Sequence, residues 1–597
     1  HLLDLVEEGD ELFFLRLSEV RHKEVFPAAS ISSVKTILEK ATSSLETTSF
    51  RDALGVVAKV LSESKNFNQE VYLITDAQAS QFAGIEATDS TDLFDDRVRM
   101  FLVQAGGKQQ ENAGVSELDL KTQIISKNKP VNMQAAVRNL GTTPLRNSIM
   151  SVYVDGSRVV QQSLDIGAMG SATANFTVVP KRRGILPGYV QLEDDALESD
   201  NRRYFVLTIP ANINILMIGE TPQDTRLASL ALTLGGDSSL AGLFSVQQAT
   251  SAQLSSLDIN KFDVLVFCGV KAFTPTEADR VAQFVRAGGG VMLFPDDETD
   301  IANLNATVFA KLNIPASQPA QEGTAAIPES FLSFAKMDND HPLFQGLFEQ
   351  PSGGKKPSGI IESPRVFKAI RPQAGEKGHT IISLSDGTGF LTEYMAGEGR
   401  LLLFSVEANL GWSDFPVKGL FAPLLHRATV YLASRNESRS STVVGERIRL
   451  SPRVRGTGGK ELYAFKSPVG IEERVVPHKS TLAGTAVFES APATEVGVYE
   501  LRKAQETIGA SAVNLDPDES DLRHVTDDQL QSFWKRVGIT DSQANRVPAT
   551  EKIETTILES RLGVELWKYF LTFAIIVALV EMAVARESKS TAVRSEA

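Results

Sequence analysis

Apolar positions in the first 106 residues alternate between strand spacing and helix spacing. Residues 11–20 predict a strand, and stretches between residues 32 and 62 carry apolar side chains at the spacing of amphipathic helices. Residues 70–76 and 97–103 are compact apolar runs of the kind found in strands buried on both faces. Strands that alternate with helices predict a parallel sheet, and we assign an α/β domain to residues 1–106.

The pattern changes at about residue 107. Short runs with apolar and polar residues in alternation follow, such as those at 131–137 and 171–178, and turn signals such as Asp155-Gly156 separate them. Because this spacing is typical of antiparallel sheets packed face to face, residues 107–210 predict an immunoglobulin-like β-sandwich.

Residues 211–436 return to alternating strands and helices. Buried strands are predicted at 213–218, 262–267 and 291–295, and the helix before the last of these ends in the glycines at 288–290. A phosphate-binding glycine run joins a strand to a helix, whereas this one joins a helix to a strand, so it predicts a helix C-cap. The alternation predicts an open, doubly wound sheet.

Beyond residue 436 the spacing is again that of short strands. Residues 437–510 contain glycine and proline turns and predict a small β domain. Residues 511–560 are polar and predict a spacer that leads to the last apolar segment.

An apolar stretch near the C-terminus predicts a transmembrane helix. The 20 residues at 566–585 include only two charged side chains, Lys568 and Glu581, both near the ends. A helix of this length rises about 30 Å, which is the thickness of a hydrocarbon core. We therefore expect a membrane helix over residues 561–588 and a short tail at 589–597.

Composition narrows the classes of function. The 597 residues carry a formal net charge of −14, which argues against general nucleic-acid binding because such binding requires a basic face. Cys268 is the one cysteine, so the chain has no internal disulfide. The residues from His1 onward begin inside an apolar pattern, and we expect a further segment before them.

Two oxygen-bearing side chains point to a metal site in the first domain. Thr48 stands at the start of a predicted helix, and Asp76 ends the predicted strand at 70–76. Ligands of open α/β sheets bind beyond the carboxyl ends of the strands, and a hydroxyl and a carboxylate are hard ligands that suit Mg²⁺. We take Thr48 and Asp76 as candidate metal ligands. The alternative is a helix N-cap beside an ordinary strand end.

This pair resembles part of the metal-ion-dependent adhesion site of von Willebrand factor A domains, whose first motif, Asp-x-Ser-x-Ser, would precede His1. The order of the domains is similar to that of BatA-type aerotolerance-regulator proteins. The likeness covers nearly the whole chain, and five runs carry it: DALESDN at 195–201, DNDHPLF at 338–344, GWSDFPVKGLFAPLLH at 411–426, AVNLDPDESD at 512–521 and ELWKY at 565–569.

The resemblance implies a partial von Willebrand A domain at 1–106, an immunoglobulin-like domain at 107–210 and an amidotransferase-like domain at 211–436. It implies a protein of the bacterial inner membrane whose large domains lie outside the cytoplasm and whose C-terminal tail lies inside it. It further implies a non-enzymatic scaffold that, when intact, binds protein partners through Mg²⁺, with a link to MoxR-type ATPases and sister von Willebrand A proteins.

A hydrolase or amidotransferase that uses Cys268 is the alternative function. A cysteine nucleophile in such a fold requires a tight Gly-x-Cys-x-Gly turn and a histidine base. The turn after the next strand instead reads FPDD at 294–297, and His341, His379 and His426 each lack the glutamate two residues on that accompanies the base. The chain therefore predicts a degenerate amidotransferase-like fold without catalytic residues.

Overall fold

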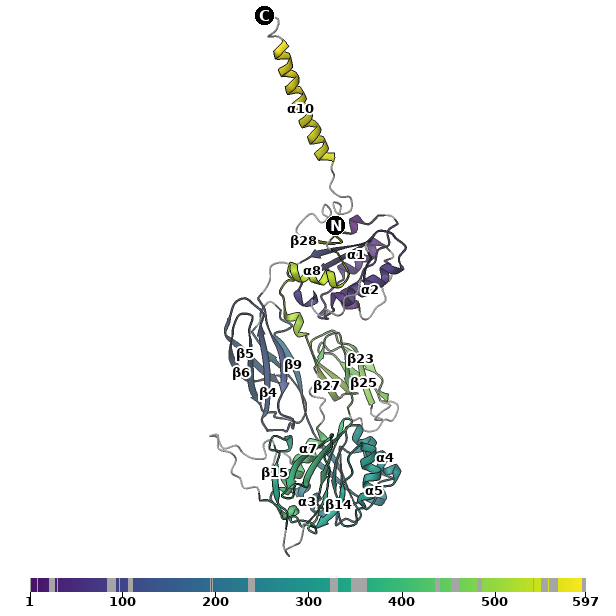
Figure 1. Ribbon diagram of the computed structural model, residues 1–597. Helices are drawn as coiled ribbons and strands as arrows, with labels where there is room; N and C mark the ends of the chain where they lie inside the picture. The colour runs from purple at the N-terminus through teal and green to yellow at the C-terminus, as the bar shows by residue number, and fades with distance from the viewer. Residues whose placement is uncertain are drawn as a thin grey trace. The chain divides into compact units, whose positions relative to one another are not determined.

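The computed structural model describes most of the chain as two compact units (Figure 1). The first unit combines residues His1–Gln110 with Asp521–Ala597, and the second spans Glu111–Ser520. The described residues are 2–7, 9–20, 27–28, 30–82, 93–95, 97–105, 111–193, 195, 197–234, 242–322, 331–344, 362–434, 441–452, 461–479, 486–540, 542–548, 557 and 567–592.

The first unit is built on a parallel sheet of three strands in the order β1 (Gln69–Thr75), β2 (Val98–Gln104) and β28 (Ala544–Pro548). Strands β1 and β2 lie where the apolar runs predict them, and β28 comes from the stretch that the sequence predicts to be a spacer. Helices α1 (Ile31–Glu39), α2 (Phe50–Glu63) and α8 (Asp527–Arg536) belong to the same unit. Segments far apart in the chain therefore form one sheet.

Aromatic side chains join the two segments of the first unit. Phe50 of α2 packs on Phe82 with ring centroids 4.8 Å apart, and Phe82 meets Phe533 of α8 edge-on at 5.2 Å. Trp534 packs beside Phe533 and is buried. Because this core draws on residues 525–539, the polar 511–560 stretch contributes an amphipathic helix to it.

The predicted strand at 11–20 is wrong. This stretch holds one isolated bridge, from Phe13 to Pro27, and a 3-10 turn at Leu17–Glu19. Apart from Val20, its apolar residues are only partly buried, so it lacks the packed neighbours that would hold an extended strand.

The predicted transmembrane helix is also wrong, together with the inner-membrane location that depends on it. Within the described residues, no helix combines the length and the apolar character needed to cross a membrane. Helix α10 (Trp567–Ala592) has only 12 residues, 569–580, between the charges of Lys568 and Glu581. These rise about 18 Å, well short of the roughly 30 Å of a hydrocarbon core.

The second unit begins with an antiparallel β-sandwich. One sheet has the order β3 (Ala113–Leu120), β4 (Val131–Asn139), β7 (Ser171–Val178). The other has the order β6 (Ser157–Ile166), β5 (Leu145–Val154), β8 (Gly184–Gln191), β9 (Arg202–Ile209). Alternate residues of both sheets form one apolar core, as the alternating runs predict.

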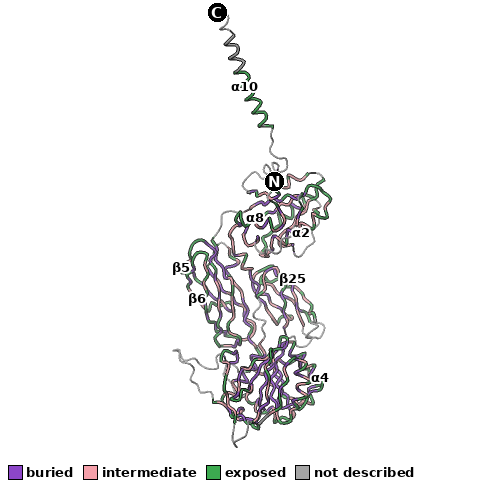
Figure 2. Tube along the Cα trace, in the orientation of Figure 1, coloured by how far each residue is buried: buried purple, intermediate pink, exposed green. Residues whose placement is uncertain are grey.

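An eight-stranded sheet forms the next part of this unit. Its order is β11 (Phe244–Thr250), β10 (Ile213–Gly219), β12 (Val264–Cys268), β13 (Gly290–Phe294), β19 (Gly399–Phe404), β18 (Gly389–Ala396), β17 (Gly378–Leu384), β15 (Phe334–Met337). The first five strands are parallel and the rest antiparallel. Accompanying helices are α3 (Arg226–Leu234), α4 (Pro275–Arg286), α5 (Ile301–Leu304), α6 (Ala310–Leu312) and α7 (Phe421–Ala433). Figure 2 shows the buried residues gathered along the central strands.

The small β domain completes the second unit. One sheet has the order β20 (Thr442–Val443), β27 (Glu506–Asn514), β26 (Gly497–Lys503), β22 (Tyr463–Lys466), β23 (Glu472–Val475). A second has the order β21 (Arg447–Leu450), β25 (Ala486–Pro492), β24 (His478–Lys479), and a separate ribbon pairs β14 (Gln318–Glu322) with β16 (Lys368–Arg371). The Asn514 side chain holds the edge of β9 by bonding both backbone groups of Tyr204, at 2.6 and 3.0 Å.

The glycines at 288–290 end α4 and start β13. Gly288 has φ +88°, and the amides of Gly288 and Gly289 donate to the carbonyls of Val285 and Phe284. These bonds satisfy the last carbonyls of the helix, which is the C-cap that the sequence predicts. A Cβ at Gly290 would lie 2.4 Å from the Cβ of Leu432 on α7, so only glycine lets this helix approach the strand.

We predict that Gly290→Ala destabilises the α/β part by about 1–3 kcal/mol, because the added methyl forces α7 away from β13. Gly419→Ala is the matched control, since no atom lies within 4 Å of a Cβ there. Denaturant unfolding measures both variants. Equal stability of the two would contradict this packing.

Candidate functional site

The predicted metal ligands, Thr48 and Asp76, lie in the first unit, and among the described contacts no hydrogen bond joins their side chains. Thr48 is buried in the loop before α2, whose N-cap is the neighbouring Ser49. Asp76 follows β1 and is exposed, with its Oδ1 3.4 Å from the hydroxyl of Thr75. The N-cap of α2 is therefore Ser49 and not Thr48.

The described residues do not supply enough oxygen ligands for a Mg²⁺ site. Asp, Glu, His and Cys side chains form no group of three that could hold a metal ion among the described residues. One hydroxyl and one carboxylate fall short of the octahedral oxygen shell of Mg²⁺ unless water supplies most of it. We derive no step of the function through this metal.

Cys268 ends β12 in the most buried part of the α/β sheet. Its side chain is 1% exposed, and its register neighbours are Gly219 on β10 and Phe294 on β13. Burial, with smaller contributions from the carboxylates of Asp224 and Asp296, raises the pKa of the thiol far above its usual range. The sulfur is therefore a neutral, apolar-packed group at neutral pH.

The turn after Cys268 is filled by an acidic side chain. Gly269 has φ +62°, and a Cβ there would lie 2.0 Å from Oδ2 of Asp296. Asp296 accepts hydrogen bonds from the Thr299 hydroxyl at 2.9 Å and the Glu298 amide at 3.0 Å. Burial raises the pKa of Asp296, and the charge of Asp224 adds to this. This carboxylate braces a loop and leaves no space beside Gly269.

Trp412 anchors the loop that follows β19. It is 2% exposed, its indole N–H donates to Asp297 at 3.1 Å, and its backbone amide donates to Glu407 at 2.7 Å. Lys368 lies over the ring at 5.1 Å and pairs with Asp297. These contacts hold the loop after β19 against the sheet.

A buried polar network joins strands β18 and β19 to helix α7. Glu393 on β18 accepts from the Tyr431 hydroxyl of α7 at 2.7 Å and contacts His341 Nε2 at 3.2 Å. Arg400 on β19 lies 3.6 Å from the same carboxylate and stacks over the Tyr431 ring at 4.5 Å. The Leu343 amide donates to His341 Nδ1, so the proton of a neutral imidazole is on Nε2, facing Glu393.

The charge of Glu393 is stabilised by its partners. Burial by itself raises the pKa of this carboxyl, but hydrogen bonds from His341 and Tyr431 and the charge of Arg400 bring it below its ordinary value. The second histidine nearby, His379, stacks on His341 and bonds Asp338 at 2.7 Å. Both imidazoles therefore bond carboxylates, which is typical of a network that stabilises the fold. The sequence offers no local signal for this network, because Glu393 and His341 are 52 residues apart.

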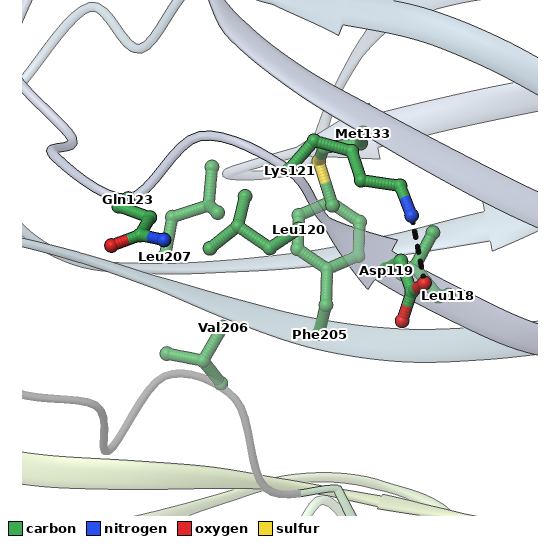
Figure 3. A pocket seen from close by; sticks show the side chains of 9 residues that line it. All are labelled: Leu118, Asp119, Leu120, Lys121, Gln123, Met133, Phe205, Val206 and Leu207. Atoms are coloured by element: carbon green, nitrogen blue, oxygen red, sulfur yellow. Dashed lines mark hydrogen bonds and ion pairs between the residues drawn. The ribbon is translucent and has the colours of Figure 1, made fainter. Parts of the chain in front are cut away.

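A cavity of about 340 Å³ opens at the edge of the β-sandwich (Figure 3). Met133 of β4 and Phe205 of β9 lie in it among leucines from β3 and β9. Its charged side chains, Asp119 and Lys121, bind each other at 3.0 Å. The cavity therefore presents no free acid or base.

Comparison with known proteins adds fold neighbours without an assignment. No family model and no curated protein matches the chain. Among solved structures, a cytoplasmic protein from Salmonella typhimurium is 13% identical, with 37% of this chain and 99% of that chain covered and a TM-score of 0.29. A ThuA-like protein from Bacteroides uniformis is 15% identical, covering 37% and 91% at a TM-score of 0.25.

A CARDB domain from Pyrococcus furiosus is 17% identical, with 17% of this chain and 96% of that domain covered and a TM-score of 0.16. None of the three is described as a von Willebrand A or BatA-type protein. At these identities and scores, the likeness carries no argument about function.

We predict that Glu393→Gln lowers stability at pH 7 by about 1–3 kcal/mol, because buried partners lose a charged acceptor. A carboxyl whose pKa is depressed by folding stabilises the protein above its unfolded pKa, and this contribution is lost as the pH falls through the folded value. The difference between wild type and variant should therefore shrink as the pH falls below about 4.5. Denaturant titrations at pH 7 and at lower pH values measure it, and a difference that does not shrink below about pH 4.5 would contradict the network.

Proposed function

We propose that this chain is a non-enzymatic interaction protein, in which the amidotransferase-like part has a structural and binding role. The observation that carries the proposal is the state of Cys268, the one thiol available as a nucleophile. A nucleophilic cysteine acts as a thiolate that its substrate can reach. Here burial favours the neutral thiol, and the side chain is almost fully enclosed.

The histidines of this part of the chain support the proposal because each has another partner. His426 is buried and bonds the Ala231 carbonyl at 2.8 Å, and burial lowers its pKa. His341 faces Glu393, and His379 faces Asp338. A base for Cys268 would have to leave one of these contacts. Partners of the MoxR type and sister von Willebrand A proteins stay a prediction of the resemblance.

The hairpin of β22 and β23 offers a surface for a protein partner. Leu462 and Val476 lie across from each other beside the Tyr463–Val475 pair, and they are 67% and 74% exposed. At the turn end of the hairpin, Val469 and Ile471 are also exposed. Large exposed apolar side chains gathered on one hairpin are typical of protein interaction sites. A partner surface with an apolar centre would fit this hairpin.

The direct test of the proposal is the reactivity of Cys268 in the full chain. We expect a thiol reagent at neutral pH to modify the folded protein at least about a thousand-fold more slowly than the denatured protein, because the reagent needs a reachable thiolate. Glutaminase and esterase assays with wild type and Cys268→Ala accompany it. Fast labelling, or an activity lost in Cys268→Ala, would favour the cysteine enzyme instead.

The hairpin gives a second prediction. A photo-reactive residue at position 462 should cross-link one discrete protein in an extract of the source cells, and Val476→Asp should reduce the yield roughly ten-fold by placing a charge in the apolar contact. Val159→Asp is the control, since Val159 is an exposed apolar residue of the β-sandwich. Equal losses in the two variants would contradict a binding role for the hairpin.

A further inference from the structure

The start of the β-sandwich contains a closed ring of polar side chains. Asn112, just before β3, donates from Nδ2 to Asp200 Oδ2 at 2.7 Å and to the Ser520 carbonyl at 2.8 Å. Asp195 accepts from the Ala113 amide at 2.6 Å and from Asn201 Nδ2 at 3.1 Å. Because Asn112 precedes Ala113 and Asp200 precedes Asn201, these bonds and two peptide links close the ring.

Three oxygens of this ring are buried without a hydrogen-bond partner among the described residues. They are Oδ1 of Asn112, Oδ1 of Asp200 and Oδ1 of Asn201. The three side chains are only 3%, 5% and 1% exposed. The Asn112 Nδ2 group donates to two acceptors, so the amide orientation is determined and Oδ1 is the atom without a partner. Three buried oxygens without partners in one ring carry a desolvation cost that a bound ligand would offset.

The negative charge of the ring also favours a bound ligand, in this case a cation. In the described part of the chain, the hydrogen-bond donors to Asp195 and Asp200 are amide groups and the hydroxyl of Ser520, all of which are neutral. The backbone closes tightly round the second carboxylate, because a Cβ at Gly114 would lie 2.7 Å from Asp200 Oδ2. Two carboxylates without a cationic partner in a partly buried site attract a cation.

We propose that Asn112, Asp195, Asp200 and Asn201 bind a Ca²⁺ ion. Carboxylate and carboxamide oxygens are hard ligands, and Ca²⁺ accepts six to eight of them in irregular geometry, whereas Mg²⁺ demands a regular octahedron. Among the described residues, no group of three Asp, Glu, His or Cys side chains could hold a metal ion. The proposed site differs from such a group because two of its four ligands are asparagine amides. A water molecule is the competing occupant, but one water has two hydrogens for the three unpartnered oxygens, and two carboxylate charges remain.

The ion would hold together distant parts of the second unit. Asn112 lies at the start of the sandwich, Asp195 to Asn201 lie between β8 and β9, and the Ser520 carbonyl shares the Asn112 amide. A Ca²⁺ ion at the ring would therefore couple the strand that opens the sandwich to the residue that ends the unit. Its effect should be to raise the thermal stability of the second unit.

Calcium chloride titration of the metal-free full chain tests the proposal, with isothermal calorimetry and thermal unfolding as readouts. Wild type should bind Ca²⁺ with a raised unfolding midpoint, and more tightly than Mg²⁺. Asp200→Asn and Asp195→Asn should each weaken binding at least about ten-fold. Asp195 is exposed, so its variant reports on binding even if Asp200→Asn fails to fold.

Two controls locate the site. Asp119→Asn removes an exposed carboxylate from the same strand β3, and Asp76→Asn removes the candidate ligand of the first unit. Both should bind Ca²⁺ as wild type does. No binding of Ca²⁺ up to about 10 mM, equal binding by Asp195→Asn, or loss of binding in Asp76→Asn would each overturn the proposal.

Discussion

The burial of the parallel strands on both faces of the α/β sheet is the constraint on which the rest of the second unit depends. Every residue of β12 and β13 is buried, so the C-terminal end of β12 opens into packed side chains. This position makes Cys268 part of the core, and it draws Asp296 against Gly269. Open α/β sheets commonly bind ligands beyond the carboxyl ends of their strands. In this protein, buried loop residues such as Trp412 fill that edge.

Two buried polar networks of this unit differ in how completely their groups are satisfied. Around Glu393, every partner contributes a donor or a positive charge, so the network needs nothing from outside. Around Asp200, three acceptor oxygens of the ring have no hydrogen-bond partner among the described residues. A network whose buried polar groups all have hydrogen-bond partners is typical of a stabilising role, whereas buried acceptors without partners point to a bound ligand. This contrast is why we place the cation at the start of the sandwich and assign no ligand to the Glu393 network.

Much of the fold could be predicted from the sequence, and the failures have physical reasons. The runs that become β1, β2 and β12 and the glycine cap of α4 are local signals, and they lie where periodicity places them. The role of residues 525–548 depends on pairing with β2 more than 400 positions away, which no local pattern encodes. Helix α10 looked long enough for a membrane only when Lys568 and Glu581 were counted within the apolar run. The two polar networks join residues that are distant in the sequence, so their contacts could not be predicted locally. The runs at 195–201 and 338–344 contain some of these residues, but the sequence did not indicate their partners.

Cys268 is a buried core residue whose thiol is neutral, and the proposal that this chain acts by binding rather than by thiol chemistry depends on that state. Because the chain has one cysteine, the infrared S–H stretching band of the folded protein reports on this side chain alone. The account predicts that the band persists unchanged as the pH rises through and beyond the ordinary range of a cysteine, up to the onset of unfolding. Disappearance of the band with a midpoint near or below about 8.5, in protein that is still folded, would contradict it.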